Sequence, residues 1–396
     1  MTFSFNLFTL GGDPLLRACA EKHPAAARGL IDFAARYNLR GDIFKAYIAY
    51  LLICEENPYA LQCERGQAPR KSLADVALAD AGELFKIFNN SSVASLLPAL
   101  ACWRGEAATD KYFKEAGEVI DSFVKSLSKA KDAVTFLRAC KLHYTLRGAG
   151  SCALNHAFRL EENSDKTEPI ILGEMKKMSD LIGLDMQKQA LLNNTRSFVE
   201  GRGGVNVLLY GDGGTGKTTS VKALLYEFAD KRLKIIEIYK HQFKYLNGLI
   251  SRIKHRGYKY ILFLDDLSFE EGEVEYKYLK TIIEGGLEPR PDNVLIYATS
   301  NRRHLIQESW RDRQDDDLHA GDTVEEKLSL VKRFGLTLYY PSPDQKEYLN
   351  IVRNLAQRAN IPVTPQLEQR ALIWQRREGG LSGRTAEQFL ISEKDK

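Results

Sequence analysis

The feature that most constrains the fold is a glycine-rich stretch between an apolar run and a helical run. Residues 211–218 fit the pattern G-x-x-x-x-G-K-T, after the apolar run 207–210 and before a predicted helix over 218–228. A strand, such a turn and a helix, in this order, form the context in which this pattern binds phosphate groups. The sequence therefore predicts a phosphate-binding loop made of Gly211, Asp212, Gly213, Gly214, Thr215, Gly216, Lys217, Thr218 and Thr219.

The chemistry of a polyphosphate explains these residue types. Glycines let the backbone curl until its N–H groups point inward, and the following helix adds unpaired N–H groups and a positive dipole end. We expect the Lys217 ammonium to bind β- and γ-phosphate oxygens and the Thr218 hydroxyl to bind Mg²⁺. The alternative interpretation is a glycine-rich turn that binds no ligand.

Short apolar runs, rich in β-branched and aromatic residues, alternate with spacers long enough for helices. They span residues 207–210, 235–239, 260–264, 294–298 and 336–339. This alternation predicts an α/β fold with a parallel sheet covered by helices on both faces. After Pro341 no further strand is predicted, and residues 343–394 indicate a small helical bundle.

The N-terminal part of the chain predicts helices only. Apolar residues recur there at helical spacing, as in Ile43, Ala46, Tyr47, Tyr50, Leu51 and Cys54. The polar stretch 161–169 then resembles a linker. We therefore predict three parts: an all-α N-terminal domain over 1–165, an α/β domain over 166–340, and a helical subdomain over 341–396.

Polar side chains follow two of the apolar runs. Asp265 and Asp266 come directly after the third run, about fifty residues beyond the phosphate loop, and Asn301 follows the fourth. We predict that Asp265 holds Mg²⁺ through water, that Asp266 orients or deprotonates the attacking water, and that Asn301 bonds that water or the γ-phosphate. The alternatives are solvated aspartates that cap a turn and an ordinary turn asparagine.

Two arginines are candidates for contacts with the transferred phosphoryl group. Arg333 lies just before the fifth run, and Arg384 lies in the C-terminal helical segment. A planar guanidinium can bond two phosphate oxygens at once. Spacing alone does not separate either residue from an ordinary surface arginine.

Composition excludes several classes of protein. Apolar residues make up 44% and charged residues 27% of the 396 residues, as in ordinary globular proteins. The net charge of +4 is too small to indicate nucleic-acid binding by itself. No apolar run approaches the ~20 residues of a membrane span. Without C-x-x-C pairs, the six cysteines indicate reduced, mostly buried thiols, and we expect a cytoplasmic protein with no membrane association.

The motifs together resemble those of the AAA+ superfamily. Residues 211–218 and Leu264-Asp-Asp266 match its Walker A and Walker B motifs, and Ala298-Thr-Ser-Asn301 resembles its sensor 1. Arg333-Phe-Gly resembles the arginine-finger segment of branch-migration motors, and Gly383-Arg384 resembles sensor 2. Over about residues 170–390 the chain is more similar to an uncharacterised bacterial AAA+ group, domain of unknown function 815. That similarity includes Asp265-Asp-Leu-Ser-Phe-Glu270, the segment 284–294 and Ala298-Thr-Ser-Asn-Arg-Arg-His304.

The resemblance implies a five-stranded parallel sheet with a helical lid, and ATP between them near a subunit interface of a homo-oligomer. Leu181 and Ile182 would contact adenine, Arg384 would act from the lid, and Arg333 would reach a neighbouring subunit's nucleotide. Most AAA+ motors carry glutamate where this chain has Asp266, whose side chain is one methylene shorter. We therefore expect slow turnover, unless Glu270 or Glu271 substitutes for it.

The main functional hypothesis is an AAA+ ATPase that couples ATP or ADP binding to remodelling of an unknown macromolecular partner. The alternative is an ATP-gated DNA-associated switch or loader with little turnover. Basic and aromatic residues at 240–245 and 254–260 could stack on single strands or lie on an amphipathic helix surface. The charged run 311–317 could be a solvated loop or face a partner. A small-molecule phosphotransferase ranks last, because no site for an acceptor is recognisable.

Overall fold

The computed structural model describes residues 5–21, 23–89, 98–104, 111–170, 176–269, 273–284, 290–301 and 331–394. The chain forms two compact units. The first comprises Met1–His156, Pro169–Gly173 and His255–Tyr258, and the second comprises Ala157–Glu168, Glu174–Lys254 and Lys259–Lys396. None of the helices in the described ranges combines the length and apolar character needed to span a bilayer.

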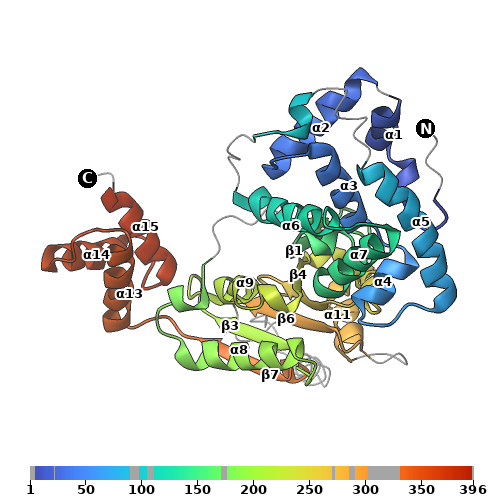
Figure 1. Ribbon diagram of the computed structural model, residues 1–396. Coiled ribbons are helices and arrows are strands. Elements are labelled where there is room, and N and C mark those ends of the chain that lie inside the picture. Colours follow the sequence, from blue (N-terminus) through green and yellow to red (C-terminus); the bar gives the residue numbers. More distant parts are fainter. Residues whose placement is uncertain are drawn as a thin grey trace. The chain divides into compact units, whose positions relative to one another are not determined.

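The first unit is built from helices, as predicted (Figure 1). Several of them begin at an aspartate or asparagine whose side chain accepts a hydrogen bond from a backbone N–H of the first turn, which stabilises the helix end. The helices are α1 (Pro14–Ala20), α2 (Pro24–Tyr37), α3 (Ile43–Cys54), α4 (Pro58–Glu64), α5 (Lys71–Asn89), α6 (Lys111–Leu127) and α7 (Ala133–Arg147).

Helix α3 lies at the centre of this unit rather than at its surface. Eight of its side chains are buried, including Phe44, Ile48 and Ala49, which lie outside the predicted apolar stripe. The pattern thus identified a helix but underestimated how completely it is enclosed. The cysteines fit the prediction of buried thiols: all six are free, and only Cys102 is exposed.

A buried ion pair belongs to the same unit. The Glu64 side chain is fully buried, and its two oxygens accept from Nε and Nη2 of Arg256 at 2.8 and 3.0 Å. The backbone N–H groups of Ala149 and Gly257 also donate to this carboxylate, at 2.9 and 2.8 Å. Glu56 accepts from Nη1 of Arg256 at 2.7 Å. The charges are thus enclosed together with hydrogen-bond partners.

The second unit contains a sheet of seven strands, two more than predicted. The strand order is β2-β1-β4-β5-β6-β3-β7. Neighbouring strands along β1-β4-β5-β6-β3-β7 pair in parallel. The bounds are β1 (Ala157–Leu160), β2 (Thr167–Pro169), β3 (Val207–Gly211), β4 (Leu233–Glu237), β5 (Lys259–Leu264), β6 (Val294–Ser300) and β7 (Leu336–Tyr340). The predicted fold class, a parallel α/β core followed by a helical lid, is confirmed.

The two additional strands occupy one edge of the sheet. Strand β2 lies in the stretch 161–169 interpreted as a linker, and β1 lies just before it, within the region predicted to contain helices only. Strand β2 is a polar Thr-Glu-Pro segment of three residues, which carries no apolar alternation to identify it. Strand β1 pairs with β4, and the Gln242 amide donates to the Leu160 carbonyl. Strand pairing in the tertiary structure, rather than local composition, makes this segment part of the sheet.

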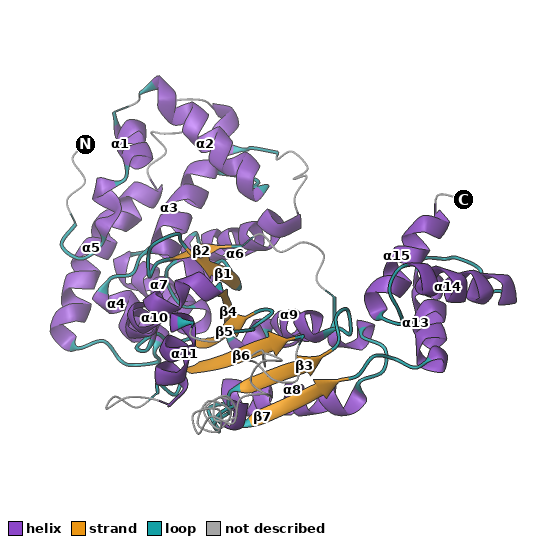
Figure 2. Cartoon of the chain, turned by 180° about the vertical axis from the view of Figure 1, so that it is seen from behind, coloured by secondary structure: helices purple, strands orange, loops and turns teal. Residues whose placement is uncertain are grey.

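The central strands bring several polar chain segments to one edge of the sheet. All seven residues of β6 are buried, as expected of a strand covered on both faces. Because β3, β5, β6 and β7 run parallel and in register, the segments after Gly211, Leu264, Ser300 and Tyr340 emerge together (Figure 2). Helix α9 packs on β4 and β6, and α8 packs on α9 and β7. The helices are α8 (Asp185–Val199), α9 (Lys217–Glu227), α10 (Leu246–Ile253) and α11 (Val274–Glu284).

Three C-terminal helices form the lid, which has its own hydrophobic core. They are α13 (Gln345–Arg358), α14 (Pro365–Arg377) and α15 (Gly383–Lys394), grouped together in Figure 1. Their core includes Tyr348, Val352, Leu367 and Phe389. Short 3-10 turns complete the described structure, at Thr9–Gly12, Pro98–Ala101, Ser151–Ala153, Met178–Asp180, Ala229–Lys231 and Lys240–Tyr245.

Candidate functional site

The predicted phosphate loop connects β3 to α9, at the edge of the sheet where the parallel strands end. Gly211 has a φ of +139°, and a Cβ placed there would lie 2.1 Å from the Tyr340 carbonyl oxygen. Gly214 and Gly216 also have positive φ angles, of +74° and +98°. The loop therefore needs glycine both for its curvature and for its close approach to β7.

Lys217 is the first residue of α9 and is buried, with 5% of its surface exposed. Its Nζ donates to the carbonyl oxygens of Gly211 at 2.8 Å and Asp212 at 2.6 Å. Burial lowers the pKa of this ammonium, and nearby Asp212 partly offsets that effect. The loop thus keeps a cation close to its own backbone, beside the N-terminus of α9.

Asp265 and Asp266 follow β5, and both are exposed. The Thr218 hydroxyl donates to Oδ1 of Asp265 at 2.7 Å, so the two predicted metal ligands lie next to each other. A hydroxyl and one carboxylate are oxygen donors of the kind that Mg²⁺ uses when a substrate phosphate and water complete its shell. No group of three His, Cys, Asp or Glu residues within the described ranges could hold a metal by itself. These residues therefore fit a magnesium ion that is bound jointly with a nucleotide.

Thr299, near the end of β6, connects the two aspartates, and sequence reasoning gave it no role. Its buried hydroxyl donates to Oδ1 of Asp265 at 2.5 Å and accepts from the backbone N–H of Asp266 at 2.9 Å. Its carbonyl oxygen accepts from the Leu267 N–H at 2.7 Å. The available signal was that the apolar strand ends in two polar residues, Thr299 and Ser300, next to the strand that carries the acids.

Asn301 lies two residues further, directly after β6. Its Nδ2 donates to Oδ1 of Asp266 at 2.7 Å. Asp266 has a φ of +52°, in the left-handed region that a non-glycine residue rarely adopts. The structure thus places the predicted sensor against the predicted catalytic carboxylate.

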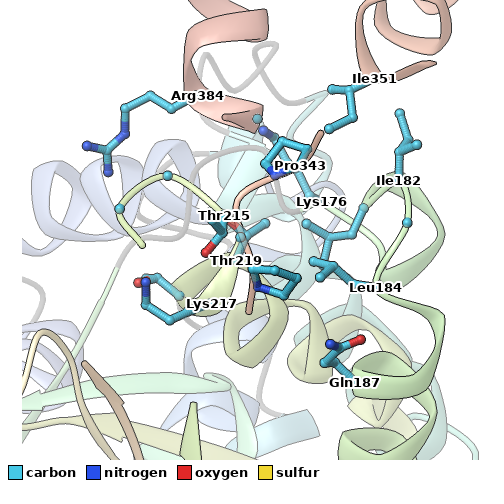
Figure 3. A pocket seen from close by; sticks show the side chains of 18 of the residues that line it. Lys176, Ile182, Leu184, Gln187, Thr215, Lys217, Thr219, Pro343, Ile351 and Arg384 are labelled. Carbon is cyan, nitrogen blue, oxygen red and sulfur yellow. The ribbon is translucent and has the colours of Figure 1, made fainter. Parts of the chain in front are cut away.

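A cavity of about 730 Å³ extends from the phosphate loop to the lid (Figure 3). Gly213 to Thr219 line it together with Asp265, Asp266 and Asn301, whereas Gly211 and Asp212 do not. The predicted adenine contacts Leu181 and Ile182 line it as well. In Figure 3, apolar Ile182, Leu184 and Ile351 lie toward one side of the cavity, and the cations of Lys217 and Arg384 lie toward the other. Apolar side chains thus gather on one side of the cavity, and Lys217 and Arg384 lie on the other, with Asp265 and Asp266 near Lys217.

The two candidate arginines occupy different places. Arg384 lines the cavity at the start of α15, and its backbone N–H donates to the Gly214 carbonyl at 3.4 Å. Arg333 is exposed and precedes β7, at the end of the strand opposite the phosphate loop, and it does not line the cavity. The candidate substitutes Glu270 and Glu271, and the charged run 311–317, lie outside the described residues.

Two ion pairs join the lid to the segment that precedes α8. Lys176 pairs with Glu387 of α15, and both side chains line the cavity. Arg358 of α13 pairs with Asp180 at 3.0 Å. Sequence reasoning missed all four residues, because the partners are separated by more than 170 positions and carry no motif.

The solved structures that are similar to the chain include three of low sequence identity. The RuvB P216G variant of Thermotoga maritima is 18% identical with a TM-score of 0.38, over 53% of this chain and 62% of that one. The FIGL-1 AAA domain in complex with ADP is 20% identical with a TM-score of 0.36, over 54% of this chain and 70% of that one. The Aeropyrum pernix Orc1 protein in complex with DNA is 17% identical with a TM-score of 0.40, over 57% of this chain and 67% of that one. Likenesses at this level do not identify an activity.

A family assignment follows from the sequence itself. No curated protein matches the chain significantly. A described family does match, over residues 153–395, a range that contains every strand of the sheet, the phosphate loop and the three lid helices. This match covers more than half of the 396 residues and confirms the resemblance drawn from the motifs. The chain therefore belongs to the family described as "Protein of unknown function (DUF815)".

Proposed function

We propose that this protein binds ATP with Mg²⁺ in the cavity between sheet and lid and hydrolyses the γ-phosphate. One observation carries the proposal: the cation of Lys217, the Thr218–Asp265 pair and the Asp266–Asn301 pair converge on one glycine-rich loop. Unpaired N–H groups at the start of α9 and the buried ammonium favour a polyphosphate there. The apolar side of the cavity, near Leu181 and Ile182, suits a nucleobase.

Each residue then has a chemical role. Lys217 exchanges its carbonyl partners for phosphate oxygens, and Thr218 and Asp265 hold the metal. Mg²⁺ would neutralise charge that develops on the phosphoryl oxygens. Asp266 accepts a proton from the attacking water or orients it, and Asn301 holds Asp266 in place. Arg384 bonds the γ-phosphate from the lid.

The proposal extends to assembly and to a partner. Arg333 lies away from its own cavity, so a contact with phosphate requires a second copy of the chain, as in a homo-oligomer. Movement of the lid with nucleotide state would then be coupled to remodelling of a macromolecular partner. Sizing with and without ATP tests the first point. A pull-down with Asp266→Asn, trapped in the ATP state, tests the second.

Phosphate release from ATP tests the central proposal. We expect Lys217→Ala to lose nucleotide binding and turnover, because the substitution removes the buried cation that Lys217 supplies at the loop. Lys222→Ala is the matched control, since Lys222 is exposed on the same helix. Equal phosphate release by wild type and Lys217→Ala would reject hydrolysis at this site.

A further inference from the structure

We infer that Thr299 is a positioning residue that sets the geometry of both acidic groups of the site, an inference that rests on the proposed function. Its single hydroxyl uses both of its hydrogen-bonding capacities here: it donates to the Asp265 carboxylate and accepts from the backbone N–H of Asp266. The residue therefore connects the proposed metal ligand Asp265 to the proposed general base Asp266.

The first of these bonds fixes the orientation of Asp265. Oδ1 of Asp265 accepts from Thr218 and from Thr299, at 2.7 and 2.5 Å. Thr218 is itself a proposed metal ligand, so its hydroxyl must turn toward the metal when the site is loaded. The Thr299 hydroxyl has no such competing role, and it continues to hold the carboxylate. Hydrogen bonds to a charged group are stronger than those between neutral groups.

The second bond fixes the unusual backbone at Asp266. The left-handed conformation costs energy in a residue with a Cβ and persists only where the surroundings hold it. Thr299 stabilises this turn by accepting two hydrogen bonds. Its hydroxyl accepts from the Asp266 N–H, and its carbonyl oxygen accepts from the Leu267 N–H. Because Thr299 and Asn301 are two positions apart, they share one side of the strand end and restrain the two adjacent acids.

The alternative is that Thr299 merely fills space in the core, since only 1% of its surface is exposed. Valine has nearly the same shape as threonine but no hydroxyl, whereas serine keeps the hydroxyl and loses a methyl group. A packing role predicts that Thr299→Val is tolerated and Thr299→Ser is not. A positioning role predicts the reverse.

The test compares the affinity of a fluorescent ADP analogue in Mg²⁺ and in EDTA. We expect Thr299→Val to reduce the gain in affinity due to Mg²⁺ by about tenfold, the effect of losing one hydrogen bond to a charged group. Affinity in EDTA should stay within about twofold of wild type, and Thr299→Ser should stay near wild type in both conditions. In an Asp265→Asn background, Thr299→Val should change the ratio of the affinities in Mg²⁺ and in EDTA by less than about twofold, as expected for coupled residues.

Several results would overturn the inference. One is a wild-type Mg²⁺ effect in Thr299→Val, and another is a loss in Thr299→Ser as large as that in Thr299→Val. An equal loss of affinity in Mg²⁺ and in EDTA would show that Thr299→Val does not act through the proposed metal ligand. If Thr299→Val does not fold, Thr299→Ala replaces it, and the same reduction in the affinity gain due to Mg²⁺ is expected. Absence of nucleotide binding by wild type would instead reject the proposed function itself, and this inference with it.

Discussion

Asn301 and Asp266 are joined by a hydrogen bond of 2.7 Å, from the amide Nδ2 of the first to Oδ1 of the second. The pair forms where β6 and β5 end side by side, so two residues 35 positions apart become hydrogen-bonded neighbours. In this arrangement the asparagine restrains the short aspartate side chain. Under the proposed function, Asn301 would act on the attacking water or the γ-phosphate through Asp266 or together with it.

The first prediction concerns this pair. Asn301→Ala should lower kcat by about tenfold while KM for ATP changes by less than twofold, because the loss is confined to the transition state. Asp266→Asn should lower kcat further and leave ADP affinity intact. Steady-state phosphate release measures both. A large rise in KM with unchanged kcat in Asn301→Ala would contradict the assignment.

The same measurement tests the expected slow turnover. Wild-type kcat should lie below the ~10 s⁻¹ typical of enzymes.

The second prediction concerns pH. Burial lowers the pKa of Lys217 below its ordinary value of 10.5. The folded protein therefore binds fewer protons than the unfolded chain between the lowered pKa and 10.5, and its stability rises with pH across that window. Nucleotide phosphates favour the charged ammonium, so nucleotide affinity should fall as pH rises through the lowered pKa.

Fluorescence titration of an ADP analogue between about pH 7 and 10.5 measures this effect. Lys217→Arg provides the control, because a guanidinium stays charged throughout. Its affinity should show no inflection in this range, even if its absolute affinity is weaker. The same inflection in Lys217→Arg would show that another group is responsible.

The third prediction concerns the lid. Both Lys176 and Glu387 line the cavity, and their ion pair joins the segment before α8 to α15. Either charge reversal, Lys176→Glu or Glu387→Lys, should speed ADP release by up to about fivefold, in line with a partly exposed pair. The double reversal restores the pair and should return the rate to within about twofold of wild type. Stopped-flow displacement measures these rates, and failure of the double variant to recover would exclude an ion-pair effect.

The fourth prediction concerns the stability of the helical unit. Arg256→Ala leaves the buried carboxylate of Glu64 without its cation, so the free energy of unfolding should fall by about 3–5 kcal/mol. Chemical denaturation of the full chain, followed by circular dichroism, measures the loss. Arg252→Ala is the control, because its pair with Asp165 is exposed and should contribute less than about 1 kcal/mol. Equal effects of the two substitutions would contradict the buried pair's importance.

The sequence by itself determined the parts of this protein whose chemistry is local. Backbone curvature needs glycine, and phosphate needs a cation and N–H groups at a helix start, so residues 211–218 could be recognised without a structure. Buried parallel strands require continuous apolar runs, and five of the seven strands were found this way. The position of Asp265 at a strand end could also be predicted, because a charged residue directly after an apolar run indicates where a buried strand ends.

The tertiary structure decided what depends on residues far apart in the chain. Strand β2 is polar and becomes a strand only through pairing, so no local pattern identifies it. Thr299 reaches Asp265 because β6 lies beside β5, and Lys176 and Glu387 meet only because the lid folds back on the sheet domain. Hydrogen bonds and ion pairs depend on distances of a few ångströms between side chains. Those distances are set by the packing of the whole domain rather than by neighbouring residues in the sequence.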